Sequence, residues 1–330
     1  MLRTRFTEVV GVAHPVVLGG MGGSTSPPLV SAVSEAGGLG VQGASLRRPH
    51  EIAALAAAIR QRTDAPFGMN VLLFRSSDEL VEAVLAAKPH VFSTAWADPG
   101  QDLATLFRRA HAAGCLVMHM VSTVGEALAA EQAGADVIVA QGTEGGGHVG
   151  LMGSSVLVPM VTSRVRVPVL AAGGFANGAG LAAALAFGAE GVLLGTRFLA
   201  TPEAPLPDRF KQVILDSDGH GTVLTEVPDI ALGWVWPGAY ARVQRNRLIE
   251  EWIGREGELR RRRSEVAARI ARARDEGDAD YAILYAGQTA GLIDHLMPAA
   301  EVVTSIVTEA EHIIGQRLPS MLDLTSAGSR

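Results

Sequence analysis

Eight short apolar runs recur along the first two hundred residues, and they constrain the fold more than any other feature of the chain. Their hydrophobicity is continuous rather than alternating, which is typical of strands covered on both faces in parallel sheets. Alanine-rich stretches of helical period separate them. The runs centre on residues 16–18, 39–41, 67–69, 91–93, 116–118, 137–139, 167–170 and 191–194. This pattern predicts a closed (β/α)8 barrel. An open doubly wound sheet is the alternative, but no Gly-x-Gly-x-x-Gly fingerprint follows the first run.

The alternation stops near Glu203, where a different kind of segment begins. Prolines lead into a polar region rich in tryptophan and arginine, and an apolar helical pattern returns only from about Tyr281. The change of pattern indicates an insertion into the barrel. We therefore expect a TIM barrel made of residues 1–207 and 281–330, with a mainly helical subdomain over residues 208–280.

Two groups of side chains characterise this predicted subdomain. Acidic residues surround the four arginines at positions 260–263, so we expect a solvated helix face rather than a nucleic-acid site. The large aromatic residues are Trp234, Trp236, Tyr240 and Trp252. They fit either a lid over a pocket or a packing core, and we favour the core.

Composition excludes several classes of partner. With 48% apolar and 19% charged residues in 330, the chain can bury a large core, and its formal net charge of -6 offers no basic field for nucleic acid or anionic lipid. No stretch reaches the length of a membrane span or a signal peptide core. The single cysteine, Cys115, argues against a disulfide or thiolate metal cluster, and we expect no metal. We expect a cytoplasmic protein with small-molecule partners; a monomer and a homodimer both stay open.

Glycine-rich loops follow the last two apolar runs. Ala172, Gly173 and Gly174 end the seventh run, and Gly195 and Thr196 end the eighth. Barrel enzymes often hold phosphate groups in these two loops, because glycine lets backbone N–H groups approach the oxygens and a helix start favours negative charge. The sequence therefore predicts a site for a phosphorylated cofactor or substrate, with tight turns as the purely structural alternative.

The segment after the sixth run, residues 141–150, is the most unusual in the chain. Five of its ten residues are glycines, and it begins with Gln141 and presents His148 after Gly146 and Gly147. Such a segment is a poor helix, and its flexible backbone suits close approach to a planar ligand. Imidazole titrates near neutral pH. His148 is thus the candidate general base or anion binder.

Two further strand ends offer ligand contacts. Gly20, Met21 and Gly22 follow the first run, and Asn70 ends the third. A thioether and glycine backbone can lie against a flat ring, and an amide can bond to its polar edge. Ordinary packing of Met21 is the alternative.

At this point the residues resemble a known family, the nitronate monooxygenases, once called 2-nitropropane dioxygenases. The similarity extends over most of the chain. It rests on residues 19–21, 68–71, 141–150, 171–174, 194–201 and 285–293.

The resemblance implies an FMN-dependent TIM-barrel enzyme without a metal, and it assigns the motif histidine, here His148, as catalytic base or anion binder. It implies phosphate contacts at Gly174, Gly195 and Thr196. It places Asn70, Gln141 and Gly147 near the flavin and the motif around Gln288 at the pocket wall. The other residues expected to contact FMN are Gly20, Met21, Gly22, Gly146, Ala172 and Gly173.

The implied reaction is oxidation of alkyl nitronates by O2 to a carbonyl compound and nitrite. An alternative on the same scaffold is an NAD(P)H:quinone reductase or a flavin-dependent enoyl-thioester reductase, in which NAD(P)H would be a second small-molecule partner. A non-flavin barrel isomerase or lyase that binds a phosphorylated substrate is the alternative of another class.

Overall fold

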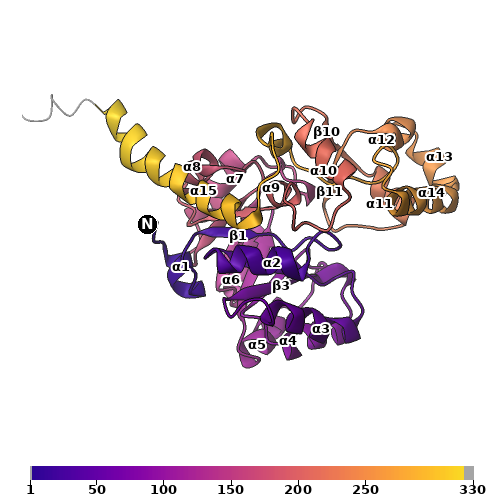
Figure 1. Ribbon diagram of the computed structural model, residues 1–330. Coiled ribbons are helices and arrows are strands. Elements are labelled where there is room, and N and C mark those ends of the chain that lie inside the picture. Colours follow the sequence, from indigo (N-terminus) through magenta and orange to yellow (C-terminus); the bar gives the residue numbers. More distant parts are fainter. Residues whose placement is uncertain (1, 323–330) are drawn as a thin grey trace, which may run out of the picture.

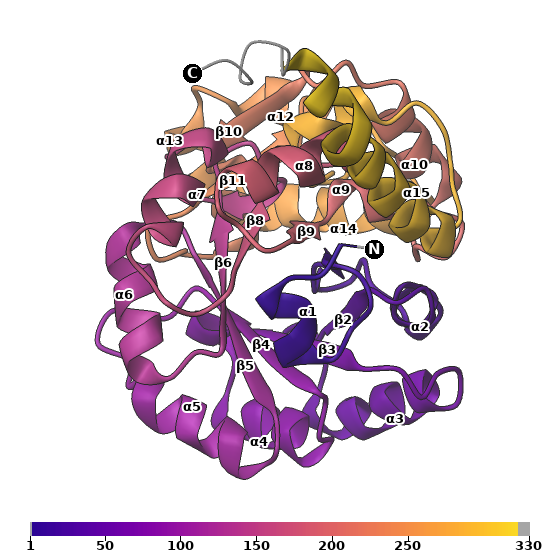
Figure 2. The same ribbon diagram turned by 90° about the vertical axis from the view of Figure 1, so that its left-hand side faces the viewer.

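The computed structural model describes residues 2–322 and contains the predicted barrel. Within these residues eight parallel strands close in the order β1-β2-β3-β4-β5-β6-β8-β9, and each apolar run lies on one of them. The strands are β1 (Val16–Leu18), β2 (Leu39–Gly43), β3 (Phe67–Leu72), β4 (Val91–Ala95), β5 (Leu116–Val121), β6 (Val137–Gln141), β8 (Val169–Ala172) and β9 (Val192–Leu194). Figure 2 shows helices ringing these strands. The (β/α)8 prediction is confirmed.

The helices of the barrel follow the strands in turn, except α1, which precedes β1. They are α1 (Arg5–Val10), α2 (Pro27–Glu35), α3 (Pro49–Arg60), α4 (Asp78–Ala86), α5 (Leu103–Ala112), α6 (Val124–Ala133), α7 (Ser154–Thr162), α8 (Gly178–Ala186), α9 (Thr196–Leu199) and α15 (Ala299–His312). Hydroxyl side chains cap several of them, as Thr123 does by accepting from Glu126 N. Helix α15 packs on α8 and α2 and completes the ring. No helix among residues 2–322 is long and apolar enough to cross a bilayer.

Helix α1 closes the amino-terminal end of the barrel. Phe6 and Val10 are buried with the side chains that fill the barrel interior. Thr4 Oγ1 donates to the Glu190 carbonyl just before β9, and His90, just before β4, hydrogen bonds to the Val10 carbonyl. Because this end is blocked, a ligand must reach the barrel from the carboxyl end of the strands, where barrel enzymes carry their sites.

The appended part lies over that carboxyl end, opposite α1 in Figure 1. It contains α10 (Asp208–Leu215), β10 (Thr222–Thr225), α11 (Val227–Leu232), β11 (Tyr240–Gln244), α12 (Arg247–Trp252), α13 (Glu256–Arg261) and α14 (Arg263–Glu276). Its hydrophobic cluster, which includes the fully buried Trp252, is separate from the barrel core and runs to Leu284. Trp252 is thus a core residue, as favoured, while the division near residues 207 and 281 stays a prediction.

A small antiparallel sheet joins the appended part to the barrel. Strands β10 and β11 pair with β7 (Gly147–Val149), which comes from the glycine-rich loop, in the order β10-β11-β7. In its register Ala241 lies opposite His148. The loop is therefore ordered partly as a strand, and its partner is nearly a hundred residues away in sequence.

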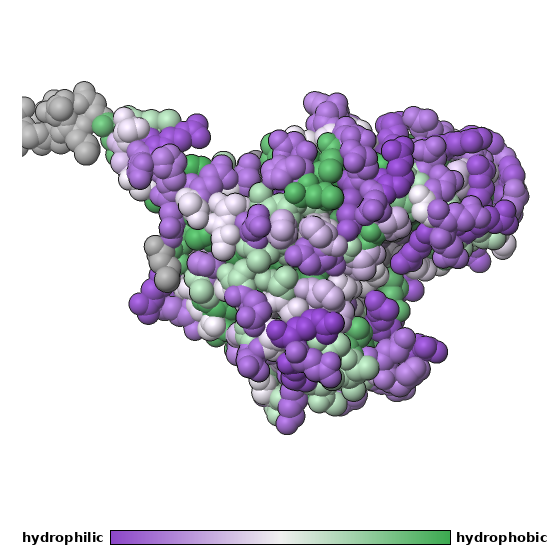
Figure 3. Space-filling view, viewed as in Figure 1, coloured by the Kyte–Doolittle hydropathy of each residue, from purple (hydrophilic) through white to green (hydrophobic). Residues whose placement is uncertain are grey.

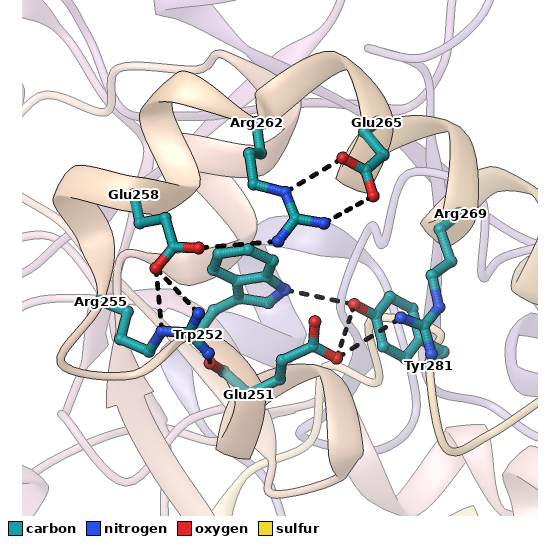
Figure 4. Close-up of polar contacts among 8 residues, drawn as sticks. All are labelled: Glu251, Trp252, Arg255, Glu258, Arg262, Glu265, Arg269 and Tyr281. Carbon is teal, nitrogen blue, oxygen red and sulfur yellow. Dashed lines mark hydrogen bonds and ion pairs between the residues drawn. The ribbon is translucent and has the colours of Figure 1, made fainter.

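The arginine-rich helices form a balanced charged surface. Arg262 bonds to Glu265 at 2.7 Å and lies near Glu258, while Arg255 bonds to Glu258 at 2.8 Å. Figure 4 shows these pairs around the buried Trp252, and Figure 3 shows a hydrophilic outer face on this side of the molecule. These contacts agree with a solvated helix face.

Candidate active site

Strand register brings the expected site residues to one edge of the barrel. Gln141 of β6 is level with Ala172 of β8, and Ala172 is level with Leu193 of β9. Leu194 is in turn level with Leu18 of β1. The loops that follow these strands therefore leave the barrel together, at the edge covered by the appended part.

The two expected phosphate loops have the backbone that glycine permits. Gly173 and Gly174 have φ values of 78° and 86°, in the left-handed region that disfavours other residues. Gly195 precedes the short helix α9, and Thr196 is its first residue. The Thr196 hydroxyl already accepts a hydrogen bond from Gly287 N at 2.9 Å, which ties this loop to the segment expected to line the pocket.

The amino-terminal end of helix α8 is less available for binding a phosphate than the sequence suggests. Asn177 caps the helix by accepting from Gly180 N at 2.9 Å, and the Glu309 carboxylate of α15 accepts from Gly178 N at 2.7 Å. A carboxylate therefore already occupies this positive helix end. A phosphate at this edge would be held by the turn at residues 173–174 rather than by the dipole of α8.

The loop after β1 lies against β3 and α9. A Cβ placed on Gly20 would lie 2.3 Å from Asn70 Cβ, so only glycine fits there. A Cβ placed on Gly195 would lie 3.3 Å from Met21 Sδ, so Met21 reaches the phosphate loop. Gly22 continues the same turn. The structure thus brings these residues together with Asn70, as expected for a wall of the ligand site.

The loop of residues 141–150 is held by contacts on both sides. The Glu144 carboxylate accepts from Ser154 N at 3.0 Å and Ser154 Oγ at 2.8 Å, at the start of α7. A Cβ on Gly146 would lie 2.5 Å from the backbone of Ala286, so the two backbones touch. Gln288 N donates to the Glu144 carbonyl at 2.9 Å, but the Gln288 side chain is exposed. Gln288 therefore supports the loop through its backbone.

His148 is paired with an acidic residue of the appended part. Its Nε2 lies 2.9 Å from Asp229 Oδ1, and the two side chains are only 6% and 7% exposed. Asp229 sits on α11, while pairing of β7 with β11 sets the position of His148. With Nε2–H donating to the carboxylate, Nδ1 is the nitrogen left to exchange a proton, and it has no protein partner among residues 2–322.

Two aromatic side chains lie against His148. The ring of Trp236 stacks on the imidazole at a centroid distance of 3.4 Å and an interplanar angle of 11°, and the Tyr285 ring lies 5.6 Å away. Burial, with the nearby negative Asp229 second, raises the pKa of Tyr285, so the phenol keeps its proton. Among residues 2–322 neither Tyr285 Oη nor Trp236 Nε1, both buried, has a hydrogen-bond partner. Two unused donors therefore border the imidazole.

The residues at this edge fit FMN. Gln141 Oε1 is buried without a partner among the described residues, as suits an acceptor for the polar edge of a flavin ring. Asn70 Nδ2 donates to Ser93 Oγ at 3.0 Å, which fixes the amide. Gly147 has a φ of 82°, and a Cβ on it would meet no described atom within 4 Å. The turn at residues 173–174 supplies the close backbone approach that a phosphate needs.

Two residues of this site were not expected from the sequence, and a third was favoured for a different role. Asp229 has no motif around it, and Tyr285 is only the first residue of the stretch 285–293, with no role implied for it. Trp236 was expected to pack in a core, yet it covers His148. A polar residue flanked by apolar ones in α11 is the one signal that marks Asp229.

Comparisons with known proteins identify the family of this chain. The family model described as nitronate monooxygenase matches residues 3–82 and 74–309. The (3aS,4S,5R,7aS)-5-hydroxy-7a-methyl-1-oxo-octahydro-1H-indene-4-carboxyl-CoA dehydrogenase of Mycobacterium tuberculosis is 33% identical, covering 94% of this chain and 96% of the relative.

Two solved structures are similar over nearly their full length. FabK from Thermotoga maritima has a TM-score of 0.88 and 34% identity, covering 98% of this chain and 100% of its own. A nitroalkane oxidase from Streptomyces ansochromogenes has a TM-score of 0.80 and 29% identity, covering 94% of this chain and 99% of its own. The chain therefore belongs to the nitronate monooxygenase family and is an oxidoreductase.

Proposed function

We propose that this protein is an FMN-dependent nitronate monooxygenase that acts on small alkyl nitronates or nitroalkanes in the cytoplasm. The observation that carries the proposal is the buried His148–Asp229 pair beside the unused hydroxyl donor of Tyr285. A base next to a hydrogen-bond donor is the arrangement needed to form and hold an oxygen-centred anion. Membership of the family favours this reaction over the isomerase or lyase alternative.

FMN would be held by its phosphate at Gly174, Gly195 and Thr196, with Gln141 and Asn70 toward the ring. When bound, the flavin supplies the electron-accepting and oxygen-reacting chemistry, which no side chain of the protein can perform. The protein groups supply binding, orientation and proton transfer.

His148 would act on the carbon next to the nitro group. Nδ1 takes the proton as the C–H bond breaks, and the bonding electrons move onto the nitro oxygens to give the nitronate anion. The carboxylate of Asp229 then faces the new positive charge on the imidazole, and Tyr285 Oη donates a hydrogen bond to a nitronate oxygen. With a preformed nitronate, the protonated imidazole serves as the anion binder.

An anaerobic mixing experiment tests the proposal. The protein, purified with its flavin and after identification of that flavin as FMN by mass, is mixed without oxygen with NADH or NADPH while the visible flavin absorbance is followed. The proposal expects almost no bleaching within seconds. Rapid bleaching would overturn it in favour of an NAD(P)H-dependent reductase.

A second candidate is oxidation or reduction of an acyl thioester. The 33% identity to a carboxyl-CoA dehydrogenase over almost the whole chain favours it. The same His148–Asp229 pair could move a proton next to a thioester carbonyl. Turnover of an acyl-CoA without nitrite release from nitronates would select this candidate.

A further inference from the structure

A cavity of about 110 Å³ lies at the carboxyl ends of β4 and β5, and one of its lining residues, Pro237, follows Trp236 in the chain. Most of its lining is apolar. The apolar side chains include Trp96, Leu103, Met120, Ala129 and Pro237. None of the sequence motifs falls on it, and the cavity takes no part in the proposed proton transfer. Such a lining suits an apolar ligand group.

The polar side chains that line the cavity are either uncharged or already hydrogen bonded to other residues of the protein. His119 is buried and hydrogen bonds through Nδ1 to Thr94 Oγ1 at 2.7 Å. Burial lowers the pKa of His119 to about 4, so the ring is uncharged at neutral pH. The Glu126 carboxylate accepts from Ser122 N at 2.7 Å and from Ser122 Oγ at 3.1 Å. No cation therefore lines this cavity to attract an anionic group.

Only a thin wall separates the cavity from His148. Trp96, which lines the cavity, meets Trp236 edge-on at a centroid distance of 6.1 Å, and Trp236 stacks on His148. Trp96 has a φ of 57°, a strained conformation for a bulky residue. Such strain persists where the surroundings enforce it, and it is common at ligand sites.

The Trp236 side of this wall belongs to a segment with a glycine at each end. Gly233 and Gly238 have φ values of 71° and 74°, and Val235 between them is 86% exposed. A Cβ on Gly238 would meet no described atom within 4 Å, so this end is not packed. At the other end Gly233 caps α11, and a Cβ on it would lie 2.8 Å from Arg263 Nη1, so that end is packed. Residues 233–238, which we call the cap, can therefore change φ and ψ at Gly238 with little loss of packing, with Gly233 as the fixed end.

We propose that this cavity is the subsite for a short unbranched alkyl chain of the substrate, and that the chain enters it when the cap turns Trp236 away from His148. The proposal rests on the proposed function, since it takes His148 as the reacting end. A cavity of about 150 Å³ holds benzene, so the present volume holds about four carbon atoms of a chain.

The test uses binding rather than turnover. Straight-chain 1-nitroalkanes from nitroethane to nitrohexane are titrated calorimetrically into the flavin-loaded protein under nitrogen. The Kd is expected to fall about two- to fourfold per added methylene until the cavity is full. Ala129→Phe, on the exposed side of α6, should abolish this gain and leave nitroethane binding unchanged. Gln132→Phe, exposed three residues along the same helix and outside the cavity, is the matched control.

Each outcome decides the proposal. A Kd independent of chain length, no binding of any nitroalkane, or a chain-length gain retained in Ala129→Phe would overturn the subsite. A chain-length gain that Ala129→Phe removes, in a protein that releases no nitrite from nitronates, would support the subsite while the proposed reaction fails.

Discussion

His148 Nε2 lies 2.9 Å from Asp229 Oδ1, although the two residues are 81 positions apart and belong to different parts of the fold. Pairing of β7 with β11 holds the histidine, and α11 holds the aspartate. The appended part therefore completes the candidate active site as well as covering it. Both side chains are buried, so the hydrogen bond is shielded from water and fixes the imidazole tautomer.

Replacement of Asp229 tests that role directly. In Asp229→Asn the amide can donate to Nε2, which shifts the proton to Nδ1 and removes the base. We expect kcat for neutral nitroalkanes to fall by about 10² or more, with a smaller change in KM and a smaller effect on preformed nitronates. The exposed Asp275→Asn carries the same charge change and should behave as wild type. Equal losses on nitroalkanes and nitronates would indicate a structural role instead.

Gly20 is predicted to be irreplaceable for steric reasons. In Gly20→Ala the new methyl group would lie 2.3 Å from Asn70 Cβ, and relief of that clash should lower the free energy of unfolding by about 1 to 3 kcal/mol. At Gly257 on α13 an added Cβ would meet no described atom within 4 Å, so Gly257→Ala should raise the free energy of unfolding by about 0.5 to 1 kcal/mol. Urea unfolding of both variants checks this, and a neutral Gly20→Ala would show that the two loops are not packed as described.

Gly174 and Gly188 allow a matched test of the proposed phosphate site. Both have left-handed φ values, 86° and 85°, so alanine at either should lower stability by about 1 to 2 kcal/mol. Only Gly174 lies at the edge that would hold the phosphate. We expect Gly174→Ala to weaken FMN binding about tenfold and Gly188→Ala to leave it unchanged, as measured by flavin fluorescence. Equal FMN affinities in the two variants would show that the phosphate does not bind at the turn of Gly174.

His119 should make stability depend on pH. Burial lowers its pKa from 6.5 to about 4, so between these values the unfolded chain binds a proton that the folded protein does not. Stability is full above about pH 6.5 and falls as the pH drops toward 4, by up to about 1.4 kcal/mol per unit. Urea unfolding of wild type and His119→Gln across this window should show the steeper fall in wild type. An equal dependence of the free energy of unfolding on pH in the two proteins would show that His119 is not the group responsible.

The barrel was predictable because its signal is local. Each parallel strand is a continuous apolar run, and its helix follows within the next residues. Two strands begin later than their runs: β9 begins at Val192, and β8 begins at Val169, after Pro168, which has no N–H to pair. Strand β7 was not predictable: residues 147–149 have the composition of a loop and become a strand only by pairing with β11.

The candidate site was predictable only in part, because only some of its residues belong to local patterns in the sequence. Glycines stand out in the sequence where no other residue fits: Gly174 has a left-handed φ, and Gly20 leaves no room for a Cβ beside Asn70. Asp229 and Trp236 meet His148 through long-range pairing of the appended part, which leaves no local pattern in the sequence. Their types are also common in ordinary packing and helix surfaces, so composition alone does not mark them.

Nitrite release from propyl-2-nitronate in air, by the purified protein with its bound flavin, tests the central claim most directly. We predict catalytic release of nitrite and acetone in equal amounts, at a rate far above that of the same concentration of free FMN. Nitrite release no faster than with free FMN, from protein shown to contain bound FMN, would contradict the proposed function.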